Sequence, residues 1–381
     1  MDKTDIPGTF NAEATLRPVN KTNMARIWNK HKQTNTPLKR KVFVGLSGGV
    51  DSSVSAYLLQ KNGYEVVGVH LRCWNRDGCD EKEARDARLV ANKLNIPFYV
   101  FDMEREYKER VVDYMINSYR NGLTPNPDVM CNQEIKFGLF LDKALSMGAE
   151  FVATGHYAKL IKEKDKSYIY EAEDKSKDQS YFLWTLDEEK LNKVLFPLGD
   201  MQKEEVREIA KEAGLHVADK KDSQGICFIG QVTLQEFLNE YLENKKGNVL
   251  NEEGKVIGTH EGAHLYTIGQ RHGLGVALNT PHYVSDKNIE TNTVVLSEGD
   301  AEALEKREVS IRDYRLNKDL QLPSRVLARV RYRQDLHEAI LSHPGDEPLL
   351  KFSQPVRFVA PGQSAVFYDD RGKLLGGGII M

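Results

Sequence analysis

A short segment rich in glycine and serine, residues 47–53, has the composition of a phosphate-binding loop. It reads Ser-Gly-Gly-Val-Asp-Ser-Ser and follows an apolar run at 42–46, so a strand is expected to lead through it into a helix. At such a turn the backbone N–H groups can converge on phosphate oxygens, and the glycines let the backbone approach closely. Asp51 in this loop is suited to holding Mg²⁺ beside a pyrophosphate. An ordinary glycine turn, with Asp51 and Ser52 capping the helix, is the alternative interpretation.

Two of the four cysteines could act as nucleophiles. Cys131 ends the proline-rich segment 124–131, and the positive end of the helix expected after it should lower the pKa of its thiol. Cys227 lies in an apolar stretch between glycines, where a small buried side chain is the alternative interpretation. Cys73 and Cys79 are interpreted as structural or incidental. Because no CxxC or HxxxH spacing accompanies any cysteine, the sequence predicts no metal site of the zinc type.

Alternating strands and helices must position these residues. The pattern from residue 41 to about residue 158 predicts an α/β domain with a doubly wound parallel sheet. Ligands of such sheets bind at the carboxyl ends of the strands. The expected strands are 42–46, 65–71, 97–101 and 151–154, and the expected helices are 52–62, 81–94, 104–119 and 134–146.

Beyond residue 159 the pattern changes twice. Helices are expected at 203–214 and 234–242, followed by short strands at 255–258, 265–269, 282–284 and 293–296. From residue 309 the chain reads as β, with strands expected at 326–332, 338–341, 355–359, 364–368 and 374–380. The predicted organisation is a flexible arm at 1–40, the α/β domain at 41–225 with a helical extension from about 200, a small mixed central domain at 226–305, and a C-terminal β-barrel at 306–381, for which a β-sandwich is the alternative.

The composition is that of an ordinary globular protein, with 40% hydrophobic and 29% charged residues in 381. Its net charge of −3 excludes a uniformly basic, histone-like protein but leaves room for local basic patches. The chain has no run of about 18 apolar residues and no hydrophobic leader, so a cytoplasmic protein without a membrane partner is expected.

The clearest basic pattern is a set of arginines near the C-terminus: Arg325, Arg329, Arg331 and Arg333. On one continuous strand they would form a basic face that can follow a phosphate backbone, and Tyr332 could stack on a base. A solvated charged strand is the alternative interpretation.

Residues 45–53 resemble the PP-loop of the ATP pyrophosphatases, which cleave ATP between the α and β phosphates and adenylate an acceptor oxygen. Further strings resemble those of the tRNA-specific 2-thiouridylases of the MnmA/TrmU type, in order and spacing, from about residue 41 to residue 381. They are TPNPDVMCNQEIKF, ATGHYAKL, KDQSYFLW, FPLGDMQKEEVREIAKEAGL, KKDSQGICFIG, YTIGQRHGLG, RYRQ and LGGGII.

This resemblance implies an ATP-dependent tRNA sulfurtransferase that makes 2-thiouridine at the wobble uridine, U34. ATP with Mg²⁺ would adenylate the C2 oxygen of that uridine, and AMP and pyrophosphate would be released. Cys227 would carry persulfide sulfur received from an upstream sulfur-relay donor protein, and Cys131 would attack it, leaving a transient Cys131–Cys227 disulfide. The implied ATP-binding residues are Gly45, Leu46, Ser47, Gly48, Gly49, Val50, Asp51, Ser52, Leu71 and Gly155.

The resemblance also implies contacts with the anticodon stem-loop of tRNA. Asp128 is expected to be a general acid or base, with a turn-capping role as its alternative. The implied tRNA-binding residues are Asn126, Pro127, Asp128, His156, Lys177, Asp178, Gln179, Arg331, Tyr332 and Gln363. For His156 the alternative is a satisfied structural histidine. A PP-loop ligase that adenylates a small molecule is the alternative function, and it would need neither cysteine.

Overall fold

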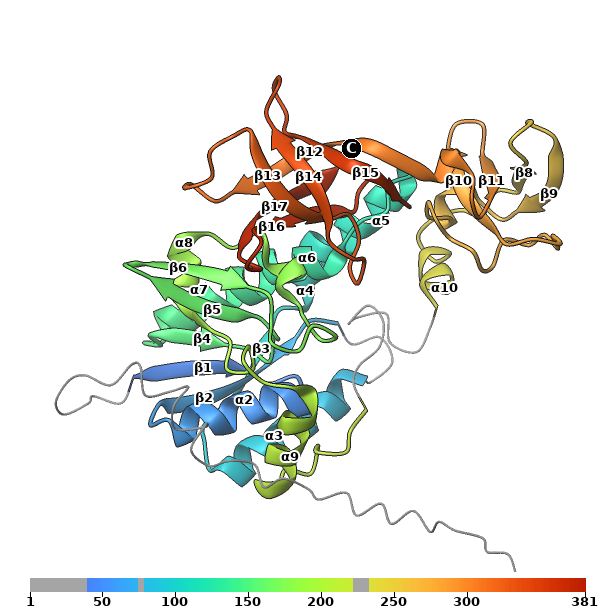
Figure 1. Cartoon of the computed structure of the whole chain (residues 1–381). Helices are drawn as coiled ribbons and strands as arrows, with labels where there is room; N and C mark the ends of the chain where they lie inside the picture. The colour runs from blue at the N-terminus through green and yellow to red at the C-terminus, as the bar shows by residue number, and fades with distance from the viewer. Residues whose placement is uncertain (1–39, 75–78, 222–232) are drawn as a thin grey trace, which may run out of the picture. The chain divides into compact units, whose positions relative to one another are not determined.

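The computed structural model describes residues 40–74, 79–221 and 233–381 (Figure 1). Cys227 and nearly all of the arm predicted at 1–40 lie outside the described residues. No helix in the described ranges is long and apolar enough to cross a membrane.

A five-stranded parallel sheet has β1 (Lys41–Gly45) at its centre, in the order β3-β2-β1-β4-β7. On one side of β1 lie β2 (Glu65–Arg72) and β3 (Phe98–Asp102). On the other side lie β4 (Phe151–Ala153) and β7 (Val194–Leu195). The strand order therefore reverses at β1, and sheets of this kind bind their ligands at such a switch point. This arrangement confirms the predicted doubly wound α/β domain.

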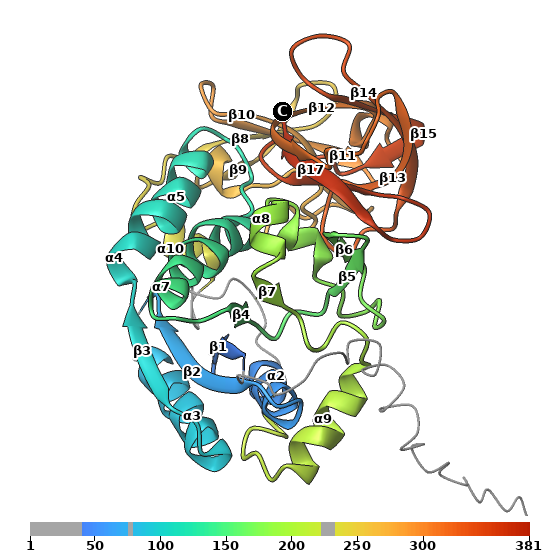
Figure 2. The ribbon, with the colours of Figure 1, turned by 90° about the vertical axis from the view of Figure 1, so that its left-hand side faces the viewer.

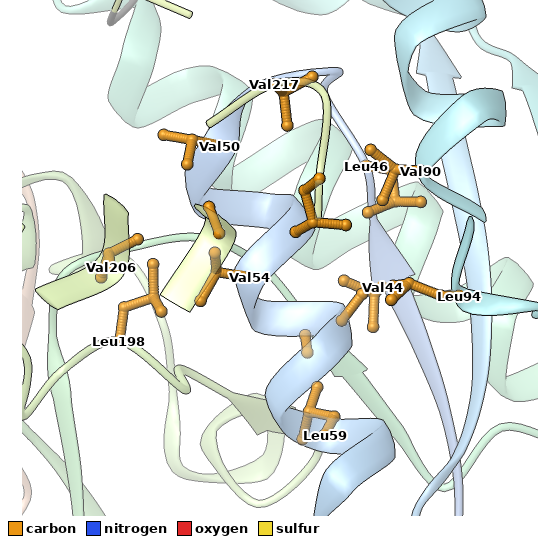
Figure 3. Close-up of a cluster of buried hydrophobic side chains, with 14 of the residues drawn as sticks. Val44, Leu46, Val50, Val54, Leu59, Val90, Leu94, Leu198, Val206 and Val217 are labelled. Atoms are coloured by element: carbon orange, nitrogen blue, oxygen red, sulfur yellow. The ribbon is translucent and has the colours of Figure 1, made fainter. Parts of the chain in front are cut away.

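Helices cover both faces of this sheet because the strand side chains alternate between two buried clusters. Val44 and other residues of one cluster pack against α2 (Val50–Lys61), α3 (Cys79–Leu94) and α9 (Lys203–Glu212) (Figures 2 and 3). Phe43 belongs to the other cluster, which lies under the helices that follow β3 and precede β4.

Both of those helical segments contain π-helical turns. The first runs as α4 (Glu104–Tyr107), the π segment η2 (Lys108–Val112) and α5 (Asp113–Arg120). The second runs as α6 (Pro127–Met130), the π segment η3 (Cys131–Leu139) and α7 (Phe140–Ser146). This second helix begins well before the predicted residue 134, because proline is favourable at the first helical position and Asn126 caps it.

Short elements follow the sheet strand β4. An antiparallel hairpin consists of β5 (Lys159–Glu163) and β6 (Lys166–Tyr170), and it precedes the 3-10 turn η4 (Ser180–Leu183) and α8 (Glu188–Leu191). The sequence pattern had not indicated this hairpin.

The central region contains α10 (Leu234–Leu238) and a four-stranded sheet in the order β10-β11-β8-β9. Its strands are β8 (Gly247–Leu250), β9 (Val256–His260), β10 (His282–Asn288) and β11 (Thr293–Glu298). The predicted strand at 265–269 is wrong. The 3-10 turn η5 (Ala263–Leu265) and a turn closed by the bond from Gln270 N to Thr267 O occupy this stretch.

The C-terminal region is a closed barrel in the order β12-β15-β14-β13-β16-β17, drawn in orange to red in Figure 1. After η6 (Glu302–Leu304), its strands are β12 (Glu305–Leu316), β13 (Ser324–Arg329), β14 (His337–Ser342), β15 (Leu349–Arg357), β16 (Ser364–Tyr368) and β17 (Leu374–Ile380). Its interior is filled by buried apolar side chains such as Ile311, Leu341 and Phe367. The predicted β-barrel is confirmed, but β13 ends at Arg329, earlier than the predicted residue 332.

Candidate active site

The glycine-serine loop joins β1 to α2 at the switch point of the sheet. Leu46 N still donates to Val69 O at 2.7 Å, so the loop leaves the sheet after that residue. Gly48 has φ +72°, and a Cβ on it would lie 2.5 Å from the backbone oxygen of Glu83. Only glycine therefore fits there, for conformational and for steric reasons.

The amino end of α2 carries no side-chain cap. Its N-cap residue is Gly49, and Ser52 Oγ instead accepts a bond from Ser47 N at 3.2 Å, inside the loop. Ser53 Oγ donates to Gly49 O at 2.7 Å. The interpretation of Asp51 and Ser52 as caps is thus wrong. The uncapped amino end of a 12-residue helix is suited to bind phosphate oxygens.

The carboxylate of Asp51 is held by two side chains that the sequence reasoning missed. Lys203 Nζ lies 2.7 Å from Asp51 Oδ1 and 2.8 Å from Oδ2, and Tyr157 Oη donates to Oδ1 at 2.8 Å. Lys203 is 5% exposed and begins α9, where its backbone N–H donates to Asp174. No local signal pointed to this lysine, because it lies 152 residues from Asp51 and reads as part of an ordinary amphipathic helix.

Gly155 allows the chain after β4 to pack on the start of α2. A Cβ on this glycine would lie 2.7 Å from Ser52 N and 3.0 Å from Asp51 Cβ. Leu71, the other residue predicted beyond the loop, is half-buried near the carboxyl end of β2. Both predicted nucleotide contacts therefore come from strand ends that flank β1 in the sheet.

A second lysine reaches the loop from the chain beyond α9. Lys220 Nζ donates to Gly48 O at 2.9 Å and to Asp86 Oδ2 at 2.7 Å. Burial opposes ionisation of Asp86, but hydrogen bonds and charges from Lys220 and His216 outweigh it and lower the pKa of this carboxyl. Lys220 precedes Cys227 by only a few residues in the sequence, although Cys227 lies outside the described part of the chain.

Cys131 is buried inside a continuous helix and does not precede one. Burial raises the pKa of its thiol, and the nearby Asp128 charge adds to this, while Lys136 and a hydrogen bond from Tyr107 act in the opposite direction. The predicted lowering of this pKa is wrong. Because the helix already begins at Pro127, the thiol lies a full turn inside it, where loss of hydration outweighs the helix dipole.

The predicted target-base residues lie at the start of that helix. Asn126 Oδ1 accepts from Val129 N at 3.3 Å, so Asn126 is the cap. Asp128, in the first turn, is half-buried and close enough to Cys131 for its charge to affect the thiol. The cap of this helix is thus Asn126 and not Asp128, and the role of Asp128 as acid or base stays a prediction.

His156 is packed inside the protein. Its ring lies 5.8 Å from that of Phe137 and 5.9 Å from that of Phe196, and its Nδ1 lies 2.6 Å from Thr154 Oγ1. Burial, together with the charge of Lys136, lowers the pKa of this histidine well below its usual value. Its burial and contacts favour the structural alternative, and a contact of His156 with tRNA stays a prediction.

Two residues of the predicted segment 177–179 also face inward. Asp178 is 3% exposed and accepts bonds from Ala172 N at 2.9 Å and Ser180 Oγ at 2.9 Å. Gln179 Oε1 accepts from Tyr157 N at 3.0 Å. Lys177 is half-buried, and its charge acts on Tyr332. The charges of both Asp178 and Lys177 act on Tyr332, another predicted tRNA contact, and of these two side chains only that of Lys177 is partly exposed.

The predicted basic strand is wrong, because its arginines lie in different environments. Arg325 is exposed on β13 and paired with Glu338, whereas Arg329 is 8% exposed and paired with Glu171. Arg331, Tyr332 and Arg333 lie in the turn after β13.

That turn forms an aromatic cluster with the α/β domain. The Tyr332 ring centroid lies 4.4 Å from that of Phe182 and 5.4 Å from the Arg333 guanidinium carbon. Phe182 belongs to η4, which follows the predicted segment 177–179 in the chain. The tertiary structure therefore brings this segment close to the predicted contacts Arg331 and Tyr332 of the barrel. Phe182 itself was missed, since its spacing gave no chemical signal.

Gln363 donates from Nε2 to Thr124 O and to Pro125 O, both at 3.2 Å. A cavity of about 580 Å³ lies beside these contacts, between the helix that begins at Pro127 and the barrel. Its lining includes Asn126, Gln133, Gly362 and Ser364. In the described ranges no group of three or more His, Cys, Asp or Glu side chains could hold a metal ion.

A parallel sheet with an uncapped helix start and a glycine-serine loop at its switch point defines a nucleotide-binding domain of the PP-loop class. Models of three known domain families match successive parts of the chain. The "tRNA methyl transferase HUP domain" matches residues 40–231, the "tRNA methyl transferase PRC-barrel domain" matches 235–298, and the "Aminomethyltransferase beta-barrel domain" matches 306–380.

Similar proteins of known name identify the family to which the chain belongs. The chain is 43% identical to the tRNA-specific 2-thiouridylase MnmA of Streptococcus thermophilus, over 90% of this chain and 95% of that protein. It is 42% identical to the protein of the same name from Legionella pneumophila, over 90% of this chain and 99% of that one. The chain belongs to the tRNA-specific 2-thiouridylase family.

Among solved structures, a 4-thiouridine synthetase–RNA complex with bound ATP is 21% identical, with a TM-score of 0.33 over 53% of this chain and 50% of that one.

Proposed function

We propose that this chain is an ATP-dependent tRNA sulfurtransferase that converts the wobble uridine, U34, to 2-thiouridine. The observation that carries the proposal is the PP-loop at the uncapped start of α2, in a chain whose relatives are named tRNA-specific 2-thiouridylases. We assign ATP binding and catalysis to residues 41–225 and tRNA binding to the barrel at 306–381, with residues 226–305 as a central domain between them.

The loop and its neighbours suit an adenylation step. The C2 oxygen of uridine is a poor leaving group, and attack of this oxygen on the α-phosphate of ATP, with loss of pyrophosphate, makes it part of a good one, AMP. Residues 45–52, Leu71 and Gly155 would bind ATP, and the cations of Lys203 and Lys220 lie beside the loop to attract its phosphates.

Asp51 fits a role as ligand to Mg²⁺, because its side chain is 32% exposed and it lies in the first turn of α2, directly after the loop glycines. Mg²⁺ would neutralise charge on the leaving pyrophosphate. Lys203 forms an ion pair with the same carboxylate, so Mg²⁺ would have to compete with this lysine for Asp51.

The sulfur step would use two cysteines. A persulfide-carrying donor protein would load Cys227 as Cys227–S–SH. The Cys131 thiolate would attack the sulfur of Cys227, forming a Cys131–Cys227 disulfide and releasing HS⁻, which attacks C2 and expels AMP. Two electrons from a cellular thiol reductant would then restore both thiols, and a reducing compartment such as the cytoplasm, which we propose as the site of the reaction, supplies such reductants.

The tRNA would contact several segments. Residues 126–128 would meet the target base, with Asp128 as general acid or base, and Lys177, Arg331 and Tyr332 would bind the anticodon stem-loop. The aromatic cluster of Tyr332 and Phe182 supports this proposal, because bases unstacked from RNA loops bind on such surfaces. A PP-loop ligase acting on a small molecule would leave the barrel and both cysteines without a purpose.

The direct test is thiolation of unmodified tRNA by the purified protein with Mg-ATP and a persulfide donor, scored on a mercury-containing gel. Cys131→Ser and Cys227→Ser should each lower thiolation at least about 100-fold while AMP formation continues. Cys73→Ser is the matched control, since we assign no role to Cys73, and it should keep the wild-type rate. Undiminished thiolation by Cys227→Ser would refute the persulfide role.

A further inference from the structure

The segment before the target-base residues is held by the C-terminal barrel. Residues 121–126 connect α5 to α6, and the last three of them, 124–126, are buried, so their backbone polar groups need partners inside the protein. Thr124 N donates to Pro361 O at 2.7 Å. Thr124 O and Pro125 O both accept from Gln363 Nε2. One barrel turn, residues 361–363, therefore satisfies three backbone groups of this segment.

The barrel turn is shaped for this contact. Gly362 has φ +93°, and a Cβ on it would lie 2.8 Å from Thr124 N and 2.9 Å from Leu123 Cβ. The turn is fixed to β17 by bonds from Gly362 N to Ile380 O and from Ile380 N to Gln363 O, each 2.8 Å. Because the barrel is closed, this turn is a rigid support for Gln363.

The contact between Gln363 and the Pro125 carbonyl determines where the helix that carries Asp128 and Cys131 begins. Asn126 follows directly on Pro125 and caps α6, so the position of the Pro125 carbonyl sets the start of the helix. Asp128 lies in the first turn of that helix, and Cys131 lies in the next one. A shift of residues 124–125 would therefore move both predicted chemical groups.

We propose that Gln363 is a positioning residue, which holds the target-base segment 126–128 and Cys131 in place through the carbonyls of Thr124 and Pro125. This inference rests on the proposed function and changes one part of it, because the resemblance had implied that Gln363 contacts tRNA. Its amide nitrogen is already committed to the protein.

The test separates positioning from tRNA binding in three variants. Gln363→Ala and Gln363→Glu both remove the donor, and Gln363→Glu also places an acceptor against two acceptors. Each should lower kcat for thiolation about 10- to 100-fold, while the Kd for tRNA at fixed salt changes less than about 2-fold. Gln363→Asn keeps the amide and should recover part of kcat. Gln60→Ala is the matched control, because Gln60 Nε2 also donates to a backbone carbonyl, that of Leu94, and should leave kcat unchanged.

A second readout does not depend on thiolation. Loosening residues 124–126 should expose Cys131, so its alkylation by iodoacetamide, followed by peptide mass spectrometry, should become at least about 5-fold faster in Gln363→Ala than in Gln60→Ala. A raised Kd for tRNA with unchanged kcat would assign Gln363 to tRNA and overturn the proposal, as would unchanged alkylation. Failure of the wild-type protein to thiolate tRNA would refute the proposed function and leave the alkylation result standing.

Discussion

The nucleotide end and the target-base end of the α/β domain are assembled in different ways. At the nucleotide end, one contiguous stretch, β1 with its loop and α2, supplies the loop backbone, the helix start and Asp51. At the target-base end, the helix that carries Asp128 and Cys131 depends on Gln363, 239 residues from Thr124. The aromatic cluster at that end joins Phe182 to Tyr332 in the same way, from two separate regions of the chain.

This difference explains where residue types predict function. A contiguous loop has its geometry built into its own backbone, so the glycines and serines at 47–53 have the arrangement that their types indicate. At the other end, polar residues that look suited to RNA are used for internal bonds. Asp178, Gln179, Arg329 and Gln363 all bind other parts of the protein.

The largest effect should follow from a change at the contiguous end. Asp51→Ala should lower AMP formation about 100- to 1000-fold, because a charged ligand beside the leaving phosphates is lost, while the Kd for tRNA stays within about 2-fold. Adenylation at the wild-type rate would show that the loop does not need its aspartate.

Loss of Asp51 also removes its ion pair with the buried Lys203, so the variant should unfold at a lower temperature. The double variant Asp51→Ala/Lys203→Met controls for this effect. It should regain thermal stability without regaining adenylation, which separates the chemical loss from the structural one.

At the target-base end, the buried environment of Cys131 should appear in the pH dependence of its alkylation. Because burial raises the pKa of the folded thiol above that of an unfolded cysteine, the neutral form is favoured, and the stability of the folded state falls as pH rises from the unfolded pKa through the folded pKa. Alkylation of Cys131 by iodoacetamide should therefore keep increasing above about pH 9, and at pH 7 it should be several-fold slower than that of an exposed thiol.

The variant Lys136→Met tests the same pKa from the other direction, because the lysine charge lowers the pKa of Cys131. Its removal should move the alkylation midpoint to still higher pH. A wild-type midpoint below that of an ordinary cysteine would instead favour the helix-start interpretation that the structure contradicts.

The smallest effect compares two arginines of the same barrel segment. Arg331→Ala should raise the Kd for tRNA several-fold and lower the slope of log Kd against log salt by about one, because one phosphate contact is lost. Arg325→Ala should change neither, since Arg325 is paired with Glu338 on the strand and lies outside the proposed contact turn. An equal rise of the Kd for tRNA in the two variants would instead favour a continuous basic face that includes Arg325.

Much of the fold could be predicted because its signals are local. Strands β1 to β4 of the parallel sheet, the helices around them and the β character of the C-terminal region follow from periodicity over windows of a few residues, whereas the two-residue strand β7 was missed. The errors lie where longer-range forces decide or where local bonds override the apolar pattern. The helix expected at 134 begins at Pro127 through an asparagine cap. The stretch 265–269 forms turns, with a local bond from Gln270 N to Thr267 O and one bond from Gly269 N to Val284 O of β10, so it has no strand ladder.

The sequence by itself determined the family, the phosphate loop and the identity of Cys131 as a candidate nucleophile, because order, spacing and residue type are sufficient for these. Only the tertiary structure decided that Lys203 neutralises Asp51, that His156 is internal and that Gln363 supports the target-base segment. Burial and partner choice are properties of residues brought together from distant positions, and they determine charge, exposure and hydrogen bonding at a site.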